Sequence, residues 1–178
     1  MLTNKNKIIY LLNNYIPFDE NEKKSKELIL DFINKQENIG KTNLDGHITA
    51  SGFVINLEKT KVLLNHHIKL DKWIQFGGHI EDNEFVFDAA VRETIEETGV
   101  SSIKYISDSI FDIDVHKIPL YKTQKAHIHY DIRFLFELDD KIDFKISEES
   151  KNIKWILLNE IENYTKSESI LRMKRKIL

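Results

Sequence analysis

Three glutamates in one short segment, Glu93, Glu96 and Glu97, are the residues of this sequence best suited to chemistry. They lie at positions i, i+3 and i+4, so a helix would project all three from one face. Carboxylates crowded in this way repel one another unless a cation compensates them. Hard divalent cations take oxygen ligands, and Mg²⁺ commonly joins such carboxylates to substrate phosphates. The spacing therefore predicts a divalent-cation site for a phosphate-containing substrate, and the alternative is a solvated acidic helix face.

The local charge favours a site over a general surface property. Residues 77–100 contain seven acidic side chains and one strong base, Arg92, which gives a formal charge of about −6. The whole chain has a net charge of −3, so the remaining residues carry about +3. Gly77 and Gly78 precede the predicted helix, where they allow the backbone to approach an ion or ligand closely. Gly99 stands where a helix commonly ends.

The order of residues in this segment resembles the Nudix box. The defining positions are filled, in chain order, by Gly78, Glu84, Arg92, Glu93, Glu96, Glu97 and Gly99. Two positions depart from the usual pattern: Thr94 replaces an aliphatic residue, and Phe76 stands where a proline often precedes the glycines. Neither is a metal-binding position. The flanking strands extend the resemblance to a Nudix domain over about residues 44–165.

The resemblance implies a hydrolase that cleaves a diphosphate linkage in a nucleoside diphosphate joined to another moiety. It implies Mg²⁺ or Mn²⁺ as cofactor, held by Glu93, Glu96, Glu97 and the carbonyl group of Gly78. One glutamate, most often the residue at the position of Glu93, would also act as general base toward the attacking water. Glu84 and Arg92 would form a supporting pair, since an arginine fork can fix the orientation of a carboxylate.

Further candidates lie outside the box. The family often places another carboxylate before a late strand with a tryptophan, and Glu149 precedes Trp155 here; a solvated loop glutamate is the alternative. Polar and apolar residues alternate in two segments, as expected for strands with one polar face each. Those faces hold Asp112, Asp114 and His116 in the first segment, and His127, His129 and Asp131 in the second. They are expected to line the substrate cleft or a second metal site, or else to form an internally satisfied polar layer.

The elements that would position these residues follow from the hydrophobic pattern. Helices are expected at about 8–15, 19–36, 84–98 and 159–177. Strands are expected at 48–56, 61–66, 72–76, 128–138 and 152–158. Strands on both sides of a central helix predict an α/β or α+β sandwich. The Nudix resemblance specifies a mixed β-sheet between helices.

Residues 1–42 are predicted to form an N-terminal helical appendage before a Nudix hydrolase domain at residues 43–178. Each of its two amphipathic helices has an apolar stripe that must be buried. We expect the appendage to pack on the flank of the domain or to form a dimer contact. The specific hypothesis is that it borders the substrate cleft, with a homodimer or a partner-protein interface as the alternative.

Composition limits the possible functions. The chain has no cysteine, which excludes cysteine nucleophiles and argues against the isoprenoid isomerases of the same fold. The N-terminus lacks a signal-peptide pattern and no apolar run reaches about 20 residues, so a cytoplasmic protein without a membrane partner is expected. The basic run at 172–176 is interpreted as a solvated helix end, with RNA contact as the alternative. The complete glutamate set favours an enzyme over a regulatory protein that senses a nucleotide-derived ligand.

Overall fold

The computed structural model of the chain describes residues 4–120 and 125–178. The helices are α1 (Asn4–Asn14), α2 (Glu20–Lys35), α3 (Val86–Thr98), the 3₁₀ helix η1 (Leu158–Asn163) and α4 (Glu168–Ile177). The strands are β1 (Gly46–Asn56), β2 (Lys61–His67), β3 (Lys72–Ile74), β4 (Phe76–His79), β5 (Lys104–Tyr105), β6 (Asp112–Ile118), β7 (His127–Leu138) and β8 (Ser150–Leu157). Within these described ranges, no helix has the length and apolar character needed to cross a membrane.

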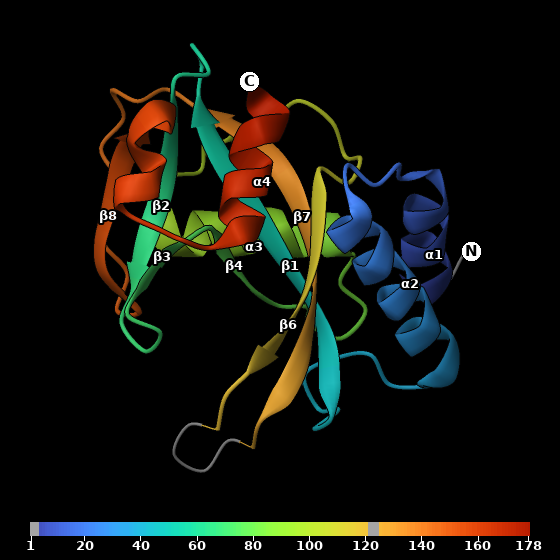
Figure 1. Cartoon of the computed structure of the whole chain (residues 1–178). Helices are drawn as coiled ribbons and strands as arrows, with labels where there is room; N and C mark the ends of the chain where they lie inside the picture. Colours follow the sequence, from blue (N-terminus) through green and yellow to red (C-terminus); the bar gives the residue numbers. More distant parts are fainter. Residues whose placement is uncertain (1–3, 121–124) are drawn as a thin grey trace.

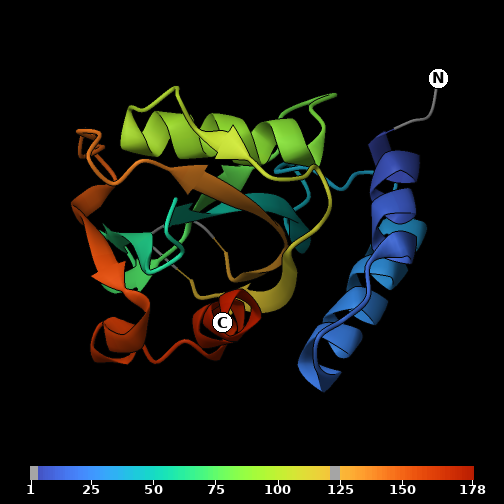
Figure 2. The same ribbon diagram turned by 90° about the horizontal axis from the view of Figure 1, so that it is seen from above.

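A mixed, curled sheet forms the centre of the molecule (Figure 1). Strand β1 pairs in parallel with β7 and antiparallel with β2 and β4, and every residue of β1 is buried. Seen from above, α3 covers one side of the sheet and α4 the other (Figure 2). The predicted α+β sandwich of Nudix type is therefore confirmed.

Two predicted elements are divided in the structure. The helix expected over 159–177 is instead η1 followed by α4. The hydroxyl group of Thr165 accepts the N–H of Ser167 at 3.2 Å, and such local bonds compete with helical ones. The strand expected over 72–76 is divided at Gln75 into β3 and β4, and the Gln75 side chain donates to Asp131 at 3.1 Å.

Helices α1 and α2 stand beside the sheet, next to β6 (Figures 1 and 2). Asp19 begins α2, and its carboxylate accepts the N–H of Glu22 at 2.8 Å. Ile8, Leu12 and Ile29 are fully buried in the same hydrophobic cluster as residues of α3 and the sheet. The two helices thus pack on the flank of the domain, which was one of the predicted arrangements.

Buried ion pairs connect this flank to the end of the chain. Lys176 donates to Glu22 and also to Asp112, the latter at 2.9 Å. Arg172 makes two hydrogen bonds to Asp112, of 2.9 and 2.8 Å. Because these two basic side chains are buried and paired, the interpretation of residues 172–176 as a solvated helix end is wrong for Arg172 and Lys176.

Candidate active site

A cavity of about 530 Å³ opens between α3, β4 and the polar face of the central strands. Its lining includes the predicted ligands Glu93, Glu96, Glu97 and Gly78. Helix α3 presents the three glutamates on one face, as their spacing predicts. The α3 helix ends at Gly99, whose φ of 69° is the left-handed conformation expected there. Local sequence therefore determines how the glutamates enter the cavity.

The two glycines of β4 hold the glutamates close to the sheet. The N–H of Gly77 donates to Glu97 Oε1 at 3.0 Å, and Gly77 has a φ of 157°. A Cβ atom on Gly77 would lie 2.3 Å from the hydroxyl oxygen of Ser51. On Gly78 a Cβ atom would lie 2.6 Å from the carboxyl carbon of Glu93. A larger residue at either position would displace a side chain that faces the cavity.

Arg92 ties the glutamates to the loop before α3. Its Nε and Nη2 atoms each donate to one oxygen of Glu84 at 2.8 Å, which is the expected bidentate pair. Its Nη1 atom donates to Glu93 Oε1 at 2.7 Å, and Nη2 also donates to the carbonyl oxygen of His79 at 3.0 Å. One guanidinium group thereby fixes both the Glu93 carboxylate and the backbone next to Gly78.

The negative charge of the glutamate cluster is only partly compensated by neighbouring groups. Burial raises the pKa of Glu97 to about 7, although Gly77 and Asn65 donate hydrogen bonds to it. Burial also raises the pKa of Glu93, and the hydrogen bond and charge of Arg92 only partly offset this effect. Glu96 is exposed and accepts a bond from Arg92 at 3.3 Å. Three carboxylates, two of which bond to the Arg92 guanidinium, are a donor set that fits a hard divalent cation.

Glu149 also lines the cavity, in the loop before β8. Its side chain is 60% exposed and lies 3.5 Å from Lys69 Nζ and 4.0 Å from His67 Nε2. Its place at the cavity agrees with the predicted role as an additional ligand or base, which stays a prediction.

The predicted polar layer divides into two parts. His116, His127 and His129 line the cavity. Burial, together with the charges of the neighbouring histidines, lowers the pKa of His129 to about 2. These three histidines therefore lie where the sequence analysis expected substrate contacts.

The expectation that Asp112 and Asp114 line the cleft is wrong for the cavity lining that the structure describes. Asp112 is fully buried where β6 meets α2 and α4, and it accepts a hydrogen bond from Arg133 at 3.2 Å. Burial raises its pKa, but the hydrogen bond from Arg172 and the charges of the nearby basic groups outweigh this and lower the pKa to about 2. Asp114 accepts bonds from Arg133 and His116. These two aspartates belong to the internally satisfied layer, the alternative that the sequence left open.

The N-terminal helices do not border this cavity. Among the described residues, its lining contains none from positions 4–42. The cleft-border hypothesis for the appendage is therefore wrong for that part of the chain. The reason is geometric, since α2 packs on β6 near Asp112, whereas the cavity begins at the other end of β6, with His116 and Ile118.

Several residues of the site were missed. Thr49 and Ser51 of β1 and Gln75 donate to the buried Asp131 at 3.0, 2.8 and 3.1 Å, on the side of the sheet that lines the cavity. His47 precedes them on the same face of β1. The alternation of polar residues at 47, 49 and 51 was the signal that could have identified this face.

The departures from the usual box pattern have structural explanations. Thr94 is fully buried, and a Cβ atom on the facing Gly52 would lie 2.3 Å from its hydroxyl oxygen. That hydroxyl donates to the carbonyl oxygen of Ala90 at 2.7 Å, so its polarity is satisfied within the helix. Phe76, the first residue of β4, is fully buried in the hydrophobic core. Neither side chain enters the cavity lining described here.

Comparison with known proteins matches residues 46–175 to the model of the NUDIX domain. The chain belongs to the Nudix family. It is 33% identical over 104 residues to a probable DHNTP pyrophosphohydrolase from Lactococcus lactis subsp. cremoris, a match covering 57% of this chain and 60% of that protein. The chain is therefore matched to less than two thirds of that relative's length.

Solved structures give the same fold. An Ap4A hydrolase from C. elegans aligns with a TM-score of 0.57 and 21% identity, covering 72% of this chain and 93% of that one. A NUDIX-family hydrolase from Clostridium perfringens aligns with a TM-score of 0.52 and 24% identity, covering 74% and 95%. At these identities the likeness concerns the fold alone.

Proposed function

We propose that this member of the Nudix family is a hydrolase that requires Mg²⁺ or Mn²⁺ and cleaves the phosphoanhydride bond of a small nucleotide-derived substrate. The observation that carries the proposal is the set of three carboxylates at the wall of a cavity of about 530 Å³, where the Arg92 guanidinium bonds to Glu93 and Glu96. A cavity of this size is typical of sites for small ligands. Glu93, Glu96, Glu97 and the Gly78 carbonyl group would hold the cation. When bound, it supplies positive charge that neutralises the phosphate oxygens.

In this proposal, residues of the chain orient the carboxylates and accept the proton of the attacking water. Arg92 fixes one oxygen of Glu93, and Gly78 leaves the space into which that carboxylate fits. Glu93 would accept a proton from the attacking water as the water oxygen bonds to phosphorus and the anhydride P–O bond breaks. The Gly77 N–H and Asn65 hold the Glu97 carboxylate against the sheet, at 3.0 and 2.6 Å.

A substrate panel tests the proposal. Nucleoside triphosphates, Ap4A, ADP-sugars and dihydroneopterin triphosphate would each be incubated with Mg²⁺, with Mn²⁺ and with excess chelator, and the products would be separated. Dihydroneopterin triphosphate is included because of the 33% identical relative named after DHNTP. Turnover of one substrate class that stops in chelator is the expected result. Turnover unaffected by chelator would contradict the metal requirement.

A regulatory protein that binds its ligand without turnover is the second candidate. The complete set of box glutamates argues for hydrolysis, because ligand sensing alone requires no general base. Saturable binding of a panel member without product formation, in either metal, would favour the sensing function instead.

A further inference from the structure

Histidines from four neighbouring strands gather on the cavity side of the sheet. His47 of β1 and His129 of β7 are direct partners in the parallel register, and His116 of β6 is the antiparallel partner of His129. His127 lies two residues before His129, on the same strand face. His79 of β4 completes the group, with its ring centroid 4.6 Å from that of His47. Sheet register therefore brings together side chains that are far apart in the sequence.

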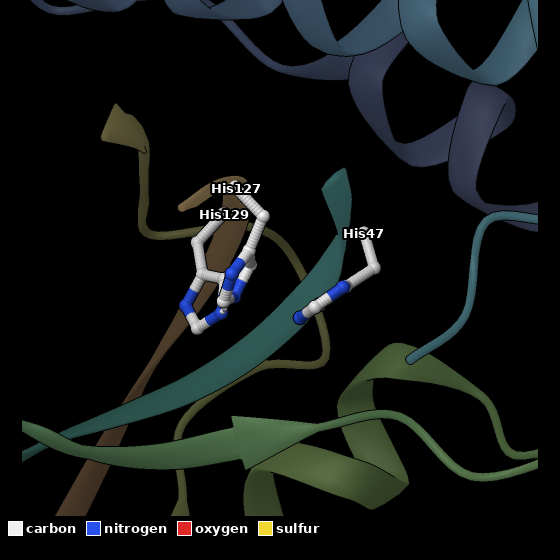
Figure 3. A group of neighbouring side chains, drawn as sticks. All are labelled: His47, His127 and His129. Carbon is white, nitrogen blue, oxygen red and sulfur yellow. Dashed lines mark hydrogen bonds between the residues drawn. The ribbon is translucent and has the colours of Figure 1, made fainter. Parts of the chain in front are cut away.

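Three of these rings converge. The ligand nitrogens of His47, His127 and His129 all lie within 4.8 Å of one another, and Figure 3 shows the rings facing each other from β1 and β7. The Nε2 atoms of His127 and His129 are 3.0 Å apart. A tetrahedral ion with bonds of about 2.0–2.1 Å holds its ligand atoms about 3.3 Å from one another. The separation of this pair is thus close to the spacing that one ion requires.

The hydrogen bonds of two rings fix their tautomers. His47 Nδ1 lies 3.2 Å from the carbonyl oxygen of Asn43, and His127 Nδ1 lies 2.8 Å from that of Lys125. A carbonyl oxygen only accepts, so each Nδ1 carries the proton, and the neutral ring has its lone pair on Nε2. Metal-binding histidines are commonly oriented by such a bond from the other ring nitrogen.

The buried nitrogens lack other partners. His47 is only 3% exposed, and its Nε2 atom has no hydrogen-bond partner among the described residues. The buried Nε2 atom of His79 likewise has none there. Burial of an unpaired polar atom destabilises a protein. An ion bound by His47 would remove this cost.

We propose that His47, His127 and His129 form a binding site for one Zn²⁺-like transition-metal ion, separate from the carboxylate site. Imidazole ligands suit Zn²⁺ and the ions of Cu, Ni and Fe, whereas Mg²⁺ and Mn²⁺ prefer carboxylate and carbonyl oxygens. The chain thus has two donor sets of different chemistry beside one cavity, and each selects its own ion. His79, whose ring lies 4.6 Å from that of His47, is a further side chain with a nitrogen that has no partner among the described residues.

The test uses the full-length protein with saturating Mg²⁺, so that the carboxylates are occupied. Zn²⁺ would be titrated by calorimetry, and Co²⁺ would serve as a probe because its visible spectrum reports nitrogen coordination. One equivalent of bound metal is expected. His129→Gln and His47→Gln should each weaken Zn²⁺ binding by more than the roughly 10–100-fold cost of losing an outer partner. His66→Gln is the matched control, because His66 pairs with Asp71 outside the cluster.

Two further measurements keep the proposal open to refutation. Nitrogen NMR of the wild-type imidazoles should show Zn²⁺ shifting the three cluster histidines and not His66, and this requires no variant to fold. The double variant Glu93→Gln/Glu97→Gln should retain the Zn²⁺ affinity of the wild type. Loss of Zn²⁺ binding in that variant but not in the histidine variants would assign the ion to the carboxylates and overturn the proposal. Absence of Zn²⁺-dependent shifts in the wild-type histidines would also overturn it.

Discussion

Two groups of carboxylates in this molecule are compensated in opposite ways. Glu93, Glu96 and Glu97 face a cavity, and one guanidinium, that of Arg92, bonds to Glu93 and Glu96. In the second group, the buried Glu22 and Asp112 form ion pairs with several basic side chains, namely Arg133, Arg172 and Lys176. The negative charge of the first group is only partly compensated, whereas basic side chains of the protein itself compensate the second.

The pKa values express this difference. Burial raises the pKa of Glu97 to about 7, while the hydrogen bond from Arg172 and nearby positive charges overcome burial and lower that of Asp112 to about 2. Burial alone therefore does not tell a structural carboxylate from a functional one. The distinction depends on whether neighbouring side chains already provide the compensating charge, because only an undercompensated group gains from a bound cation.

The largest expected effect comes from removing one side of the second group. Deletion of residues 1–42 should abolish stable folding, because it removes Glu22 and the buried Ile8, Leu12 and Ile29. Lys176 would lose a charge partner, and β6 would lose its cover. Near-ultraviolet circular dichroism and size-exclusion chromatography would detect the loss of fixed packing. A folded truncated protein with the wild-type unfolding midpoint would show that the helices are dispensable.

Glu97→Gln tests the first group. We expect kcat to fall by roughly 10²–10⁴-fold, the range associated with a positioned catalytic carboxylate, while the fold persists. Rotation of the Asn65 amide, whose oxygen has no hydrogen-bond partner among the described residues, could accommodate the new amide group. Asp88→Asn is the matched control, with the same charge change on an exposed position of α3 outside the described cavity lining. Equal kinetics for the two variants would contradict the assignment.

Asp112→Asn should act on stability. Removing one charge of a buried pair typically destabilises a protein by about 3–5 kcal/mol, because the partner is left uncompensated. Glu162→Gln breaks an exposed pair between η1 and Lys174 of α4 and should cost at most about 1 kcal/mol. Urea unfolding of both variants measures the contrast. Similar unfolding midpoints would mean that the Asp112 pairs contribute no more than surface ones.

The two groups should also give opposite pH dependences in metal-free protein. The folded pKa of Glu97 is raised from 4.5, so its contribution to stability is complete below pH 4.5 and is lost as the pH rises through about 7. The folded pKa of Asp112 is lowered from 3.8, so its contribution is present above pH 3.8 and is lost as the pH falls through about 2. Urea midpoints measured from pH 2 to 8 in chelator should therefore decline at both ends.

Variants and metal separate the two ends of that profile. Glu97→Gln should flatten the decline between pH 4.5 and 7 by an amount on the order of 1.36 kcal/mol per pKa unit. Added Mg²⁺ should reverse the same decline in wild-type protein, since the cation favours the ionised carboxylate. If Mg²⁺ instead changed only the acid end, the cation would bind elsewhere.

The sequence predicted the first group well because its information is local. Glu93, Glu96 and Glu97 lie within two turns of one helix, and helical geometry alone places them on one face. Arg92 and Glu84 are eight residues apart, still within reach of that helix's beginning. The strand pattern likewise predicted most strands of the sheet, whereas its mixed character was implied by the Nudix resemblance.

The second group could not be predicted because its pairs are remote in the sequence. Lys176 and Glu22 are 154 residues apart, and Arg172 and Asp112 are 60 apart. Nothing local marks residues 172–176 as buried, since basic residues at a helix end are usually solvated. The place of Asp112 was misjudged for the same reason: strand alternation gives its face, but only tertiary packing shows that α2 packs on β6 and that Arg172 of α4 bonds to Asp112.

The smallest expected effect concerns Glu149. Like the first group it lines the cavity, and like the second it has basic side chains nearby. Its side chain is 60% exposed, and its carboxylate lies 3.5 Å from Lys69 Nζ and 4.0 Å from His67 Nε2. Solvent screening limits the interaction free energy of such an exposed charge to about 1 kcal/mol, so Glu149→Gln should change kcat by no more than about tenfold. Glu148→Gln, an exposed neighbour outside the described lining, should have no effect. A loss as large as that of Glu97→Gln would instead place Glu149 among the carboxylates that handle the cation or the proton, despite its exposure in this structure.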